Sequence, residues 1–415
     1  MKDSGFSLER KTDSFIDWKL ILYVIALLGV GVMALYSATY SSNMGESFNR
    51  QLMSIGFGVV GATILIFIPK NIMRNLAVVF YGLSILLLVL VLFIGDEVYG
   101  TKGWIRFGGF SLQPAEFAKF GVIMMLAYFL SSKGTEITNI RDFSISAGIV
   151  LLPFILVFLQ PDHGTSSVLL AIFLGILFWG GFNKFLLFFV VSLPFILIFS
   201  LKGMWYMVSA VSIFSVFAII FRASWISKGL VVLVFVTIGY VAPLIYNTLL
   251  DHQKARIETF LNPGSDPRGQ GYNVIQSMMA VGSGGVSGKG FLQGTQTQLR
   301  YIPMQWTDFI FSVPTEEFGF GGGLAILAFF GLFLLRTLEI SNQADDRFYS
   351  LAAFGISSVF LYHIIINIGM VVGLVPVMGI PLPFLSYGGT SMLVNLAFVG
   401  FLLNAYRNHR RKRLI

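Results

Sequence analysis

The sequence predicts an all-α polytopic integral membrane protein, and two observations lead to this fold class. Hydrophobic residues make up 56% of the 415 residues and charged residues 12%, with a mean hydropathy of +0.80, which leaves too little polar surface for a soluble globule. Long apolar stretches also recur along the whole chain. We therefore expect a single polytopic membrane domain over residues 1–415.

Each membrane helix needs roughly 20 apolar residues, because the hydrocarbon core is about 30 Å thick and a helix rises about 1.5 Å per residue. The first such stretch is too long for the core of a signal peptide and lacks a small-residue cleavage site, so we expect it to be retained. Twelve stretches meet the requirement, near 18–38, 52–69, 76–94, 115–131, 143–160, 166–182, 184–201, 204–221, 229–249, 318–338, 349–370 and 390–406.

The region 184–250 is predicted to hold an extra helical hairpin. Its first two stretches are joined by a very short turn near Lys202 and Gly203, so they are either full spans or tilted, half-membrane segments. Removing both together leaves the orientation of every other helix unchanged. The placement of the rest of the chain therefore does not depend on this hairpin.

Basic residues indicate the orientation of the helices, because cytoplasmic loops carry an excess of Lys and Arg. With a cytoplasmic amino terminus, both termini lie inside, and the net charge of +8 is explained without nucleic acid by these loops and by anionic membrane lipids. The residues that fit the rule are Lys70, Arg74, Lys133, Arg141, Lys184, Arg222, Lys228, Arg336, Arg347 and the tail RNHRRKRLI.

The polar stretch 251–317 falls outside the membrane by the same count, and we expect it to be a large extracytoplasmic catalytic loop. Its cations depart from the positive-inside trend. They either bind an anionic headgroup, through charge-assisted hydrogen bonds to phosphate oxygens, or belong to a solvated, salt-bridged loop. These cations are Lys254, Arg256, Arg268, Lys289 and Arg300.

Within this loop, the glycine-rich run GSGGVSGKG at 282–290 invites comparison with a phosphate-binding P-loop. That motif requires Ser or Thr after its lysine, whereas Gly290 follows Lys289 here. We therefore expect a glycine-rich turn between short helices.

Three carboxylates lie near the point where the loop re-enters the membrane. Asp308 stands in an aromatic setting at a dry boundary, where a raised pKa suits a general base, although a helix cap or a loop carboxylate fits its position equally well. Glu316 and Glu317 fall in the first turn of the next helix, where the helix dipole favours negative charge. We expect a structural role for at least one of these two.

Other ionisable residues lie at predicted membrane boundaries. Glu116 and Lys119 are three residues apart on one helix face, as a structural ion pair or as part of a site. Asp162 is expected to cap a helix, and His363 to be a hydrogen-bonded packing residue. His163 is a poor indicator of a metal site, and zinc is not expected without further ligands. The chain has no cysteine, so catalysis has to come from carboxylates, histidines, lysines or a bound ion.

Taken together, the motifs resemble those of the SEDS (shape, elongation, division and sporulation) family, and specifically its RodA branch; the piece GTQTQL is more similar to this branch than to the FtsW branch. The resemblance runs nearly end to end. It rests on KGWIRFGGFSLQPAEFAK at 102–119, QPDHGTS at 160–166, RIETFLNPGSDPRGQGYNVIQS at 256–277, GSGGVSGKGFLQGTQTQL at 282–299, TDFIF at 307–311, EEFGF at 316–320 and GMVVGLVPVMGIPLPFLSYGGTS at 369–391.

The resemblance implies a peptidoglycan glycosyltransferase that polymerises lipid II into β-1,4 glycan strands during cell elongation and rod-shape maintenance, on the outer face of the bacterial cytoplasmic (inner) membrane. Asp308 matches the catalytic aspartate of the family, which fits an inverting displacement that needs a base on the acceptor hydroxyl. Candidates for stabilising the polyprenyl pyrophosphate leaving group are Lys119, Arg106, Lys289 and a divalent cation, Mg²⁺ or Mn²⁺, with no organic cofactor. The other matching motif residues are Gln113, Glu116, Glu316, Glu317, Ser386 and Tyr387.

The chain departs from the family pattern in two respects. RodA-like proteins usually have ten membrane helices, whereas twelve are predicted here, and Trp306 stands where the family often has histidine. The family also implies a partner, a class B penicillin-binding protein that acts as the transpeptidase. Two alternatives stay open, a lipid II flippase and a non-catalytic scaffold of the cell-wall synthesis complex. A flippase would be expected to show midplane charges and repeat symmetry, and neither is visible in the sequence.

Overall fold

The computed structural model of the protein describes residues 15–40, 45–98, 100–107, 110–248, 251–265 and 269–413. In this part of the chain, each predicted apolar stretch coincides with one long helix, which confirms the helical membrane fold. These helices are α1 (Trp18–Tyr40), α2 (Gly45–Phe67), α3 (Lys70–Ile94), α4 (Pro114–Leu130), α5 (Ile140–Phe158), α6 (His163–Trp179), α7 (Lys184–Lys202), α8 (Met204–Ile220), α9 (Trp225–Thr248), α13 (Ser312–Gln343), α14 (Arg347–Val371) and α15 (Gly389–Arg413).

Nine of the described helices are long and apolar enough to cross a membrane by length and composition. The helices α4, α6 and α8 have 17 residues each and fall short of that length, so the predicted number of twelve spans stays a prediction. Exposed tryptophans lie at the starts of α8 and α9, two of the helices in the region 184–250. Trp205 at the start of α8 is 84% exposed and Trp225 at the start of α9 is 77% exposed, as in the aromatic belts of membrane interfaces.

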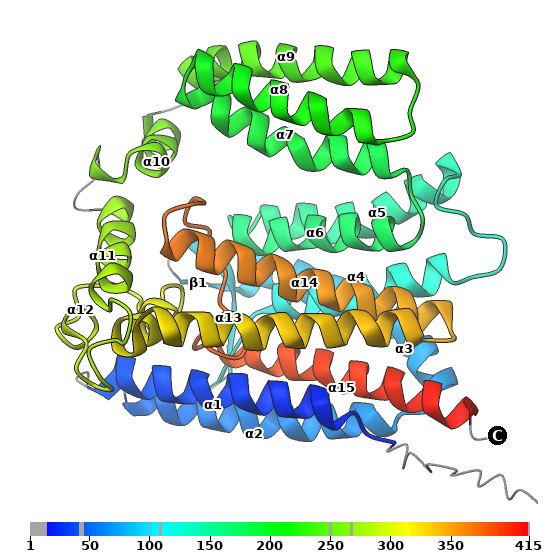
Figure 1. The fold of residues 1–415 in the computed structure, drawn as a ribbon. Helices are drawn as coiled ribbons and strands as arrows, with labels where there is room; N and C mark the ends of the chain where they lie inside the picture. The colour runs from blue at the N-terminus through cyan, green and yellow to red at the C-terminus, as the bar shows by residue number, and fades with distance from the viewer. Residues whose placement is uncertain are drawn as a thin grey trace, which may run out of the picture.

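The main body is formed by α1–α6 and α13–α15, which run side by side (Figure 1). In this body α2 packs on α15, α3 on α4, α13 on α1 and α14, and α14 on α6. The apolar core lies between these helices and includes Val122, Ile172, Phe333, Phe360 and Phe398. Helix α14 is surrounded by others, which explains why most of its apolar residues are buried.

The helices α7, α8 and α9 form a separate bundle with its own core of Phe185, Ile196, Met207 and Phe235. Figure 1 shows this bundle as a layer above the main body. Its contacts with the body are made chiefly by α7 against α6. The region 184–250 thus holds three helices in its described part, and residues 249 and 250 lie outside the described residues.

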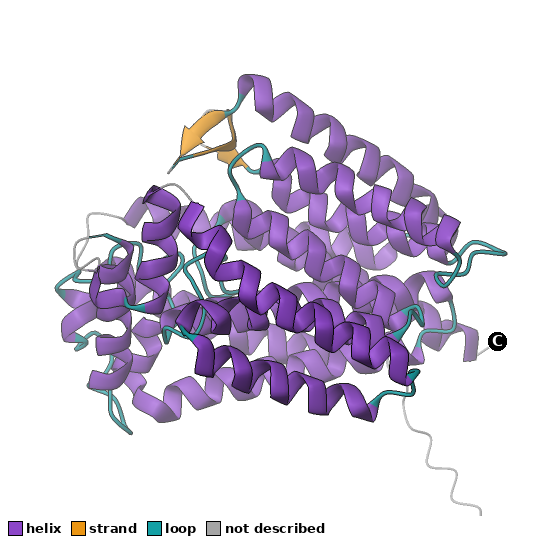
Figure 2. Ribbon diagram, turned by 90° about the horizontal axis from the view of Figure 1, so that it is seen from above, coloured by secondary structure: helices purple, strands orange, loops and turns teal. Residues whose placement is uncertain are grey.

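The predicted outer loop is mostly helical and lies at the same end of the molecule as a small sheet (Figures 1 and 2). It contains α10 (Asp251–Leu261), a 3-10 turn at Pro263–Ser265, α11 (Gln270–Ser283) and α12 (Thr295–Gln298). The sheet, which the sequence did not predict, is antiparallel in the order β1 (Asp96–Val98), β2 (Thr101–Phe107) and β3 (Phe110–Leu112). Over the residues that the structure describes, the fold is therefore all-α except for this sheet.

Candidate active site

A cavity of about 1310 Å³ opens at the end of the molecule that carries the sheet, between the main body, α7 and α10. Part of its wall is polar and comes from the sheet, from the amino-terminal ends of α2, α4, α6 and α15, and from the segment before α13. This part includes Arg50, Arg106, Gln113, Glu116, Asp162, Asp308, Tyr387 and Thr390. The remaining wall is apolar and includes Leu197, Ile198 and Leu201 of α7, and Ile257, Phe260 and Leu261 of α10.

Asp308 is a half-buried residue of this wall, in the turn that precedes α13. Burial raises the pKa of its carboxyl group to about 6. Among the described residues no donor is bonded to its carboxylate oxygens and no cation is paired with them, so desolvation is not offset. The carboxylate is therefore available as an acceptor for a hydroxyl group that enters the cavity.

The backbone around Asp308 is held by hydrogen bonds from two other segments. The carbonyl oxygen of Trp306 accepts from the backbone N–H of Tyr387 at 2.9 Å, and that of Thr307 accepts from Oγ of Ser386 at 2.6 Å. The carbonyl oxygen of Asp308 accepts from Nδ2 of Asn367 at 2.9 Å. Ser386 is thus a buried support of the loop, whereas Tyr387 lines the cavity.

Glu116 and Lys119 form a buried ion pair below the polar wall. Nζ of Lys119 lies 2.7 Å from Oε2 of Glu116, and the side chains are 1% and 4% exposed. The ammonium group also lies 3.4 Å from Nε2 of His363, whose Nδ1 is 2.9 Å from the carbonyl oxygen of Pro381. Because an ammonium group only donates, Nε2 accepts and Nδ1–H donates. Glu116 reaches the cavity, and Lys119 lies behind it.

Gln113, Asp162 and Arg106 complete the predicted part of the wall. Nε2 of Gln113 donates to Oδ2 of Asp162 at 2.9 Å, while Oδ1 of Asp162 accepts from the backbone N–H of Thr165. Asp162 is therefore the N-cap of α6, as the sequence indicated. Arg106 of β2 is largely exposed and lies 3.6 Å from Asp96, a weak pair that leaves its guanidinium free to contact an anion.

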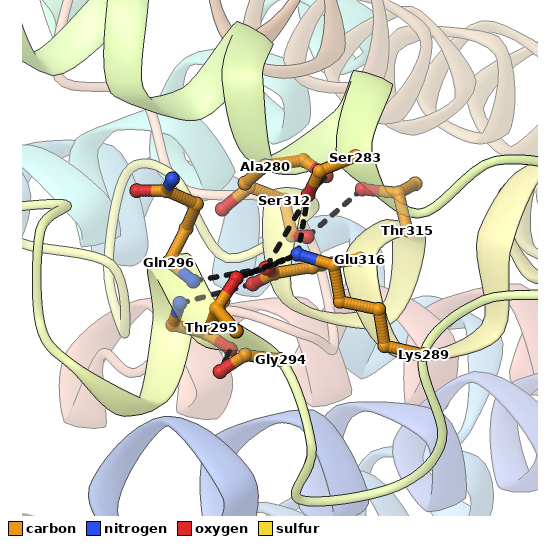
Figure 3. A network of polar contacts seen from close by, with 10 residues as sticks. Ala280, Ser283, Lys289, Gly294, Thr295, Gln296, Ser312, Thr315 and Glu316 are labelled. Carbon is orange, nitrogen blue, oxygen red and sulfur yellow. Dashed lines mark hydrogen bonds and ion pairs between the residues drawn. The ribbon is translucent and has the colours of Figure 1, made fainter.

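Lys289 and Glu316 belong to a polar network beside the cavity (Figure 3). Nζ of Lys289 donates to Oε1 of Glu316 at 2.6 Å and to the hydroxyls of Ser283 and Thr295 at 2.7 Å each. Glu316 is fully buried and also accepts from the backbone N–H groups of Gln296 and Thr297. Lys289 does not line the cavity, and its contacts hold the loop 284–299 against α13.

The glycine-rich run fits the same junction. Gly319 interrupts α13 with φ 65° and ψ −161°, so the carbonyl oxygens of Glu316 and Glu317 accept from the N–H groups of Lys289 and Gly290. Gly288 has φ +81°, and a Cβ there would lie 2.1 Å from the carbonyl oxygen of Glu317. The run is therefore a glycine-rich turn that packs backbone against backbone, as predicted.

Glu317 joins the loop to the first helix. Its Oε1 accepts hydrogen bonds from Oγ of Ser37 in α1 and from the backbone N–H of Leu292. Ser37 also accepts from Nε2 of Gln298 at 2.9 Å. The two glutamates of the EEFG motif thus fasten the loop to α1 and α13 and do not line the cavity.

Three site residues were not found from the sequence: Arg50, Gln51 and Asn367. Arg50 lines the cavity, and Gln51 bonds both the carbonyl of Ser386 and the N–H of Gly388, at 3.1 Å each. Both precede the apolar run of α2 and so fell outside the predicted helix. An arginine at the predicted outer end of a membrane helix, against the positive-inside trend, was the available signal.

Within the described part of the chain, no group of three or more His, Asp or Glu side chains is placed to hold a metal ion. The carboxylate of Asp162 is bound by Gln113, and that of Glu116 is paired with Lys119. Asp308 belongs to no group of three such side chains among the described residues. The protein alone therefore offers no cage for a divalent cation in these residues.

Comparison with known proteins shows similarity along nearly the whole chain. The family model of FtsW, RodA and SpoVE, described as "Cell cycle protein", matches residues 18–212 and 207–411. The chain is 35% identical to the peptidoglycan glycosyltransferase RodA of Treponema pallidum, over 94% of this chain and 97% of that protein. It is 35% identical to the stage V sporulation protein E of Bacillus subtilis, over 95% and 98% of the two chains.

Solved structures give the same picture. A chain from a structure described as the structural coordination of polymerization and crosslinking by a peptidoglycan synthase complex is 30% identical, with a TM-score of 0.72 over 95% of this chain and 98% of that chain. The rod shape determining protein RodA of Thermus thermophilus is 25% identical, with a TM-score of 0.63 over 95% and 97%.

Proposed function

We propose that this chain, which belongs to the FtsW, RodA and SpoVE family, is a peptidoglycan glycosyltransferase that polymerises lipid II into β-1,4 glycan strands. The observation that carries the proposal is the half-buried carboxylate of Asp308, which faces a large cavity, has no bonded donor among the described residues and has a pKa raised to about 6. Such a group is ionised at neutral pH and still basic enough to accept a proton.

Asp308 acts as the general base of an inverting displacement. The carboxylate accepts the proton of the 4-hydroxyl of the acceptor sugar, and the hydroxyl oxygen attacks the anomeric carbon of the donor sugar. The bond from that carbon to the phosphate oxygen breaks, and the polyprenyl pyrophosphate leaves with the electron pair. The new bond is β because attack occurs opposite to the α-linked leaving group.

Arg50 and Arg106 are the cations that the cavity offers to the pyrophosphate. Both line the polar wall, and both side chains are about half exposed, at 46% and 58%. Their pairs with Glu46 and Asp96 are exposed and hence weak, so a pyrophosphate can replace the carboxylates. Lys119 lies behind Glu116 and Lys289 in the loop network, so we assign neither of them to the leaving group.

The apolar wall is suited to the isoprenoid part of the substrate. Leu197, Ile198 and Leu201 project from a membrane helix, and Ile257 and Phe260 face the same cavity from α10. A lipid-linked sugar can then present its headgroup to Asp308 while its chain stays in contact with apolar side chains. A divalent cation, Mg²⁺ or Mn²⁺, would be brought by the pyrophosphate, since phosphate-bound Mg²⁺ needs only one or two carboxylates. No step above is assigned to it, and polymerisation with and without chelator tests this.

We assign the chain to the elongation branch on the motif GTQTQL, which forms α12 and the residues beside it. On this assignment it acts in the bacterial cytoplasmic membrane with both termini inside, and with a class B penicillin-binding protein as transpeptidase partner. A complex of polymerising and crosslinking proteins is described for one structural neighbour. The branches are separated by expressing this protein in a rod-shaped host that lacks its own elongation enzyme or its own division enzyme. An elongation enzyme restores rod shape in the first host, and a division enzyme restores septation in the second.

The test of the function is polymerisation of purified lipid II by the protein bound to its partner. Long glycan strands from the wild-type protein support the proposal. A flippase would instead move labelled lipid II across vesicles without making polymer. A scaffold would bind the partner and do neither.

A further inference from the structure

Asn367 joins the backbone of Asp308 to that of Ile380 through two hydrogen bonds from one amide group. Nδ2 donates to the carbonyl oxygen of Asp308 at 2.9 Å and to that of Ile380 at 2.8 Å. Asn367 lies in α14 and is completely buried. Because a carboxamide has two N–H donors, both are used here, and each reaches a different segment of the chain.

The second segment forms the wall beside the carboxylate. Gly379 precedes Ile380 with φ +66°, and a Cβ on it would lie 3.8 Å from Oδ2 of Asp308. Met378, Gly379 and Pro381 line the cavity. The amide of Asn367 therefore fixes the distance between the backbone of Asp308 and the segment 378–381, which lines the cavity beside the carboxylate.

The neighbouring turn of α14 supports this arrangement. His363 precedes Asn367 by four residues, so the two side chains lie on one face of the helix. Nδ1 of His363 bonds the carbonyl oxygen of Pro381 at 2.9 Å, next to the carbonyl that Asn367 bonds. One face of α14 thus holds two consecutive carbonyls of the wall, and only Asn367 also holds the loop of Asp308.

We propose that Asn367 is a positioning residue of the glycosyltransferase: its amide clamps Asp308 to the segment around Ile380, so that the carboxylate faces the acceptor hydroxyl. The proposal rests on the proposed function for its consequence in catalysis. The clamp itself is a statement about backbone order and has its own test. Misplacing a catalytic group by about 1 Å can cost up to about 100-fold in rate.

The chain contains a matched control in Asn404. This residue is 1% exposed, lies in α15, and its Nδ2 donates to the carbonyls of Leu65, Ile66 and Ile68 at 2.8–3.0 Å. Its Nδ2 binds backbone carbonyls as that of Asn367 does, and its Oδ1 also accepts from the hydroxyl of Tyr349 and from Nδ2 of Asn408, at the end of the helices away from the cavity. Asn404→Leu therefore shows what losing a buried clamp does to the fold alone.

The experiment compares wild type, Asn367→Leu and Asn404→Leu as complexes with the penicillin-binding partner. The initial rate of lipid II consumption is measured per folded complex over a range of lipid II concentrations, and amide hydrogen exchange is followed in residues 304–311. We expect Asn367→Leu to lower kcat by about 10- to 100-fold with KM within about threefold. Exchange in 304–311 is expected to rise in Asn367→Leu only.

A kcat for Asn367→Leu within about threefold of Asn404→Leu, per folded complex, would overturn the proposal. If Asn367→Leu does not fold, Asn367→Asp replaces it, because the carboxyl group is isosteric and loses at least one of the two donors. A normal kcat for that variant would equally overturn the clamp. If wild type makes no polymer, the proposed function fails, and hydrogen exchange alone then decides whether Asn367 orders the loop.

Discussion

The carboxylate of Glu116 lies 2.7 Å from the ammonium group of Lys119. Both residues belong to the first two turns of α4, and both side chains are almost completely buried. Removing one member of such a pair leaves an unpaired buried charge, whereas removing both leaves none. We expect Lys119→Met to destabilise the protein by about 3–5 kcal/mol, and Glu116→Gln with Lys119→Met to recover most of that loss. Thermal unfolding in detergent measures both.

Activity in the same double variant separates the two roles that the sequence left open for this pair. Polymerisation at a near-normal rate would show that the pair only stabilises α4 and its contact with His363. A rate that stays at least about tenfold low in a stable double variant would contradict a purely structural role, since that loss is about 1.4 kcal/mol of transition-state stabilisation.

Lys289 is expected to stabilise the outer loop and not to bind substrate. Its ammonium group is occupied by Glu316, Ser283 and Thr295. Lys289→Met should expose the loop 284–299 to limited proteolysis while changing KM for lipid II by no more than about threefold, less than 1 kcal/mol. Lys254→Met, another lysine of the outer loop, is the control. A large rise in KM with an intact loop would instead place Lys289 at the pyrophosphate.

The pH dependence of polymerisation should report Asp308. Burial raises the pKa of this carboxyl group to about 6, and a general base is active only when ionised. The initial rate should therefore fall about tenfold per pH unit below about pH 6 and level off above it. The rate is measured with the transpeptidase of the partner blocked, in buffers from about pH 4 to 8. An acid limb near pH 4, where an ordinary aspartate titrates, would contradict the assignment.

The sequence predicted the features that depend on neighbouring residues and missed contacts between residues far apart in the chain. The length of the apolar stretches predicted all the long helices, because a membrane span depends on local composition. The sheet was missed, since its strands β1 and β3 have three residues each and alternate with glycine turns. The pair of Lys289 and Glu316 joins residues 27 apart, and no local pattern indicates it.

The site residues were likewise predicted only where a local pattern or a motif pointed to them. Asp308 stood out by its aromatic surroundings and by its motif, and the structure places it in the cavity wall. Arg50 was excluded because α2 begins at Gly45, seven residues before its apolar run. Asn367 is one of several polar residues in a mostly apolar helix, and only the folded chain shows that its amide reaches Asp308 and Ile380.

The helices α8 and α9 are expected to be dispensable for catalysis. They pack mainly on α7, and no residue from 204–248 lines the cavity. Deleting both together preserves the orientation of every other helix, so the variant should insert and polymerise lipid II at no less than about half the wild-type rate, a change below 1 kcal/mol. Replacing Leu197, Ile198 and Leu201 of α7 by serine should lower the rate in a variant that still inserts, because the change removes apolar side chains from the wall. An inactive but inserted α8–α9 deletion would show that these two helices take part in the site.

The measurement that tests the central claim most directly is polymerisation of lipid II by Asp308→Asn beside wild type, each bound to the partner. The amide keeps the shape of the side chain but cannot accept the proton, and it removes a buried charge, so its melting temperature should not fall. The control is Asp345→Asn, the same change in the turn between α13 and α14, where Oδ2 of Asp345 lies 3.2 Å from Nδ1 of His409. We predict no glycan strands from Asp308→Asn and normal strands from the control. Polymer from Asp308→Asn at a rate near that of wild type would contradict Asp308 as the general base.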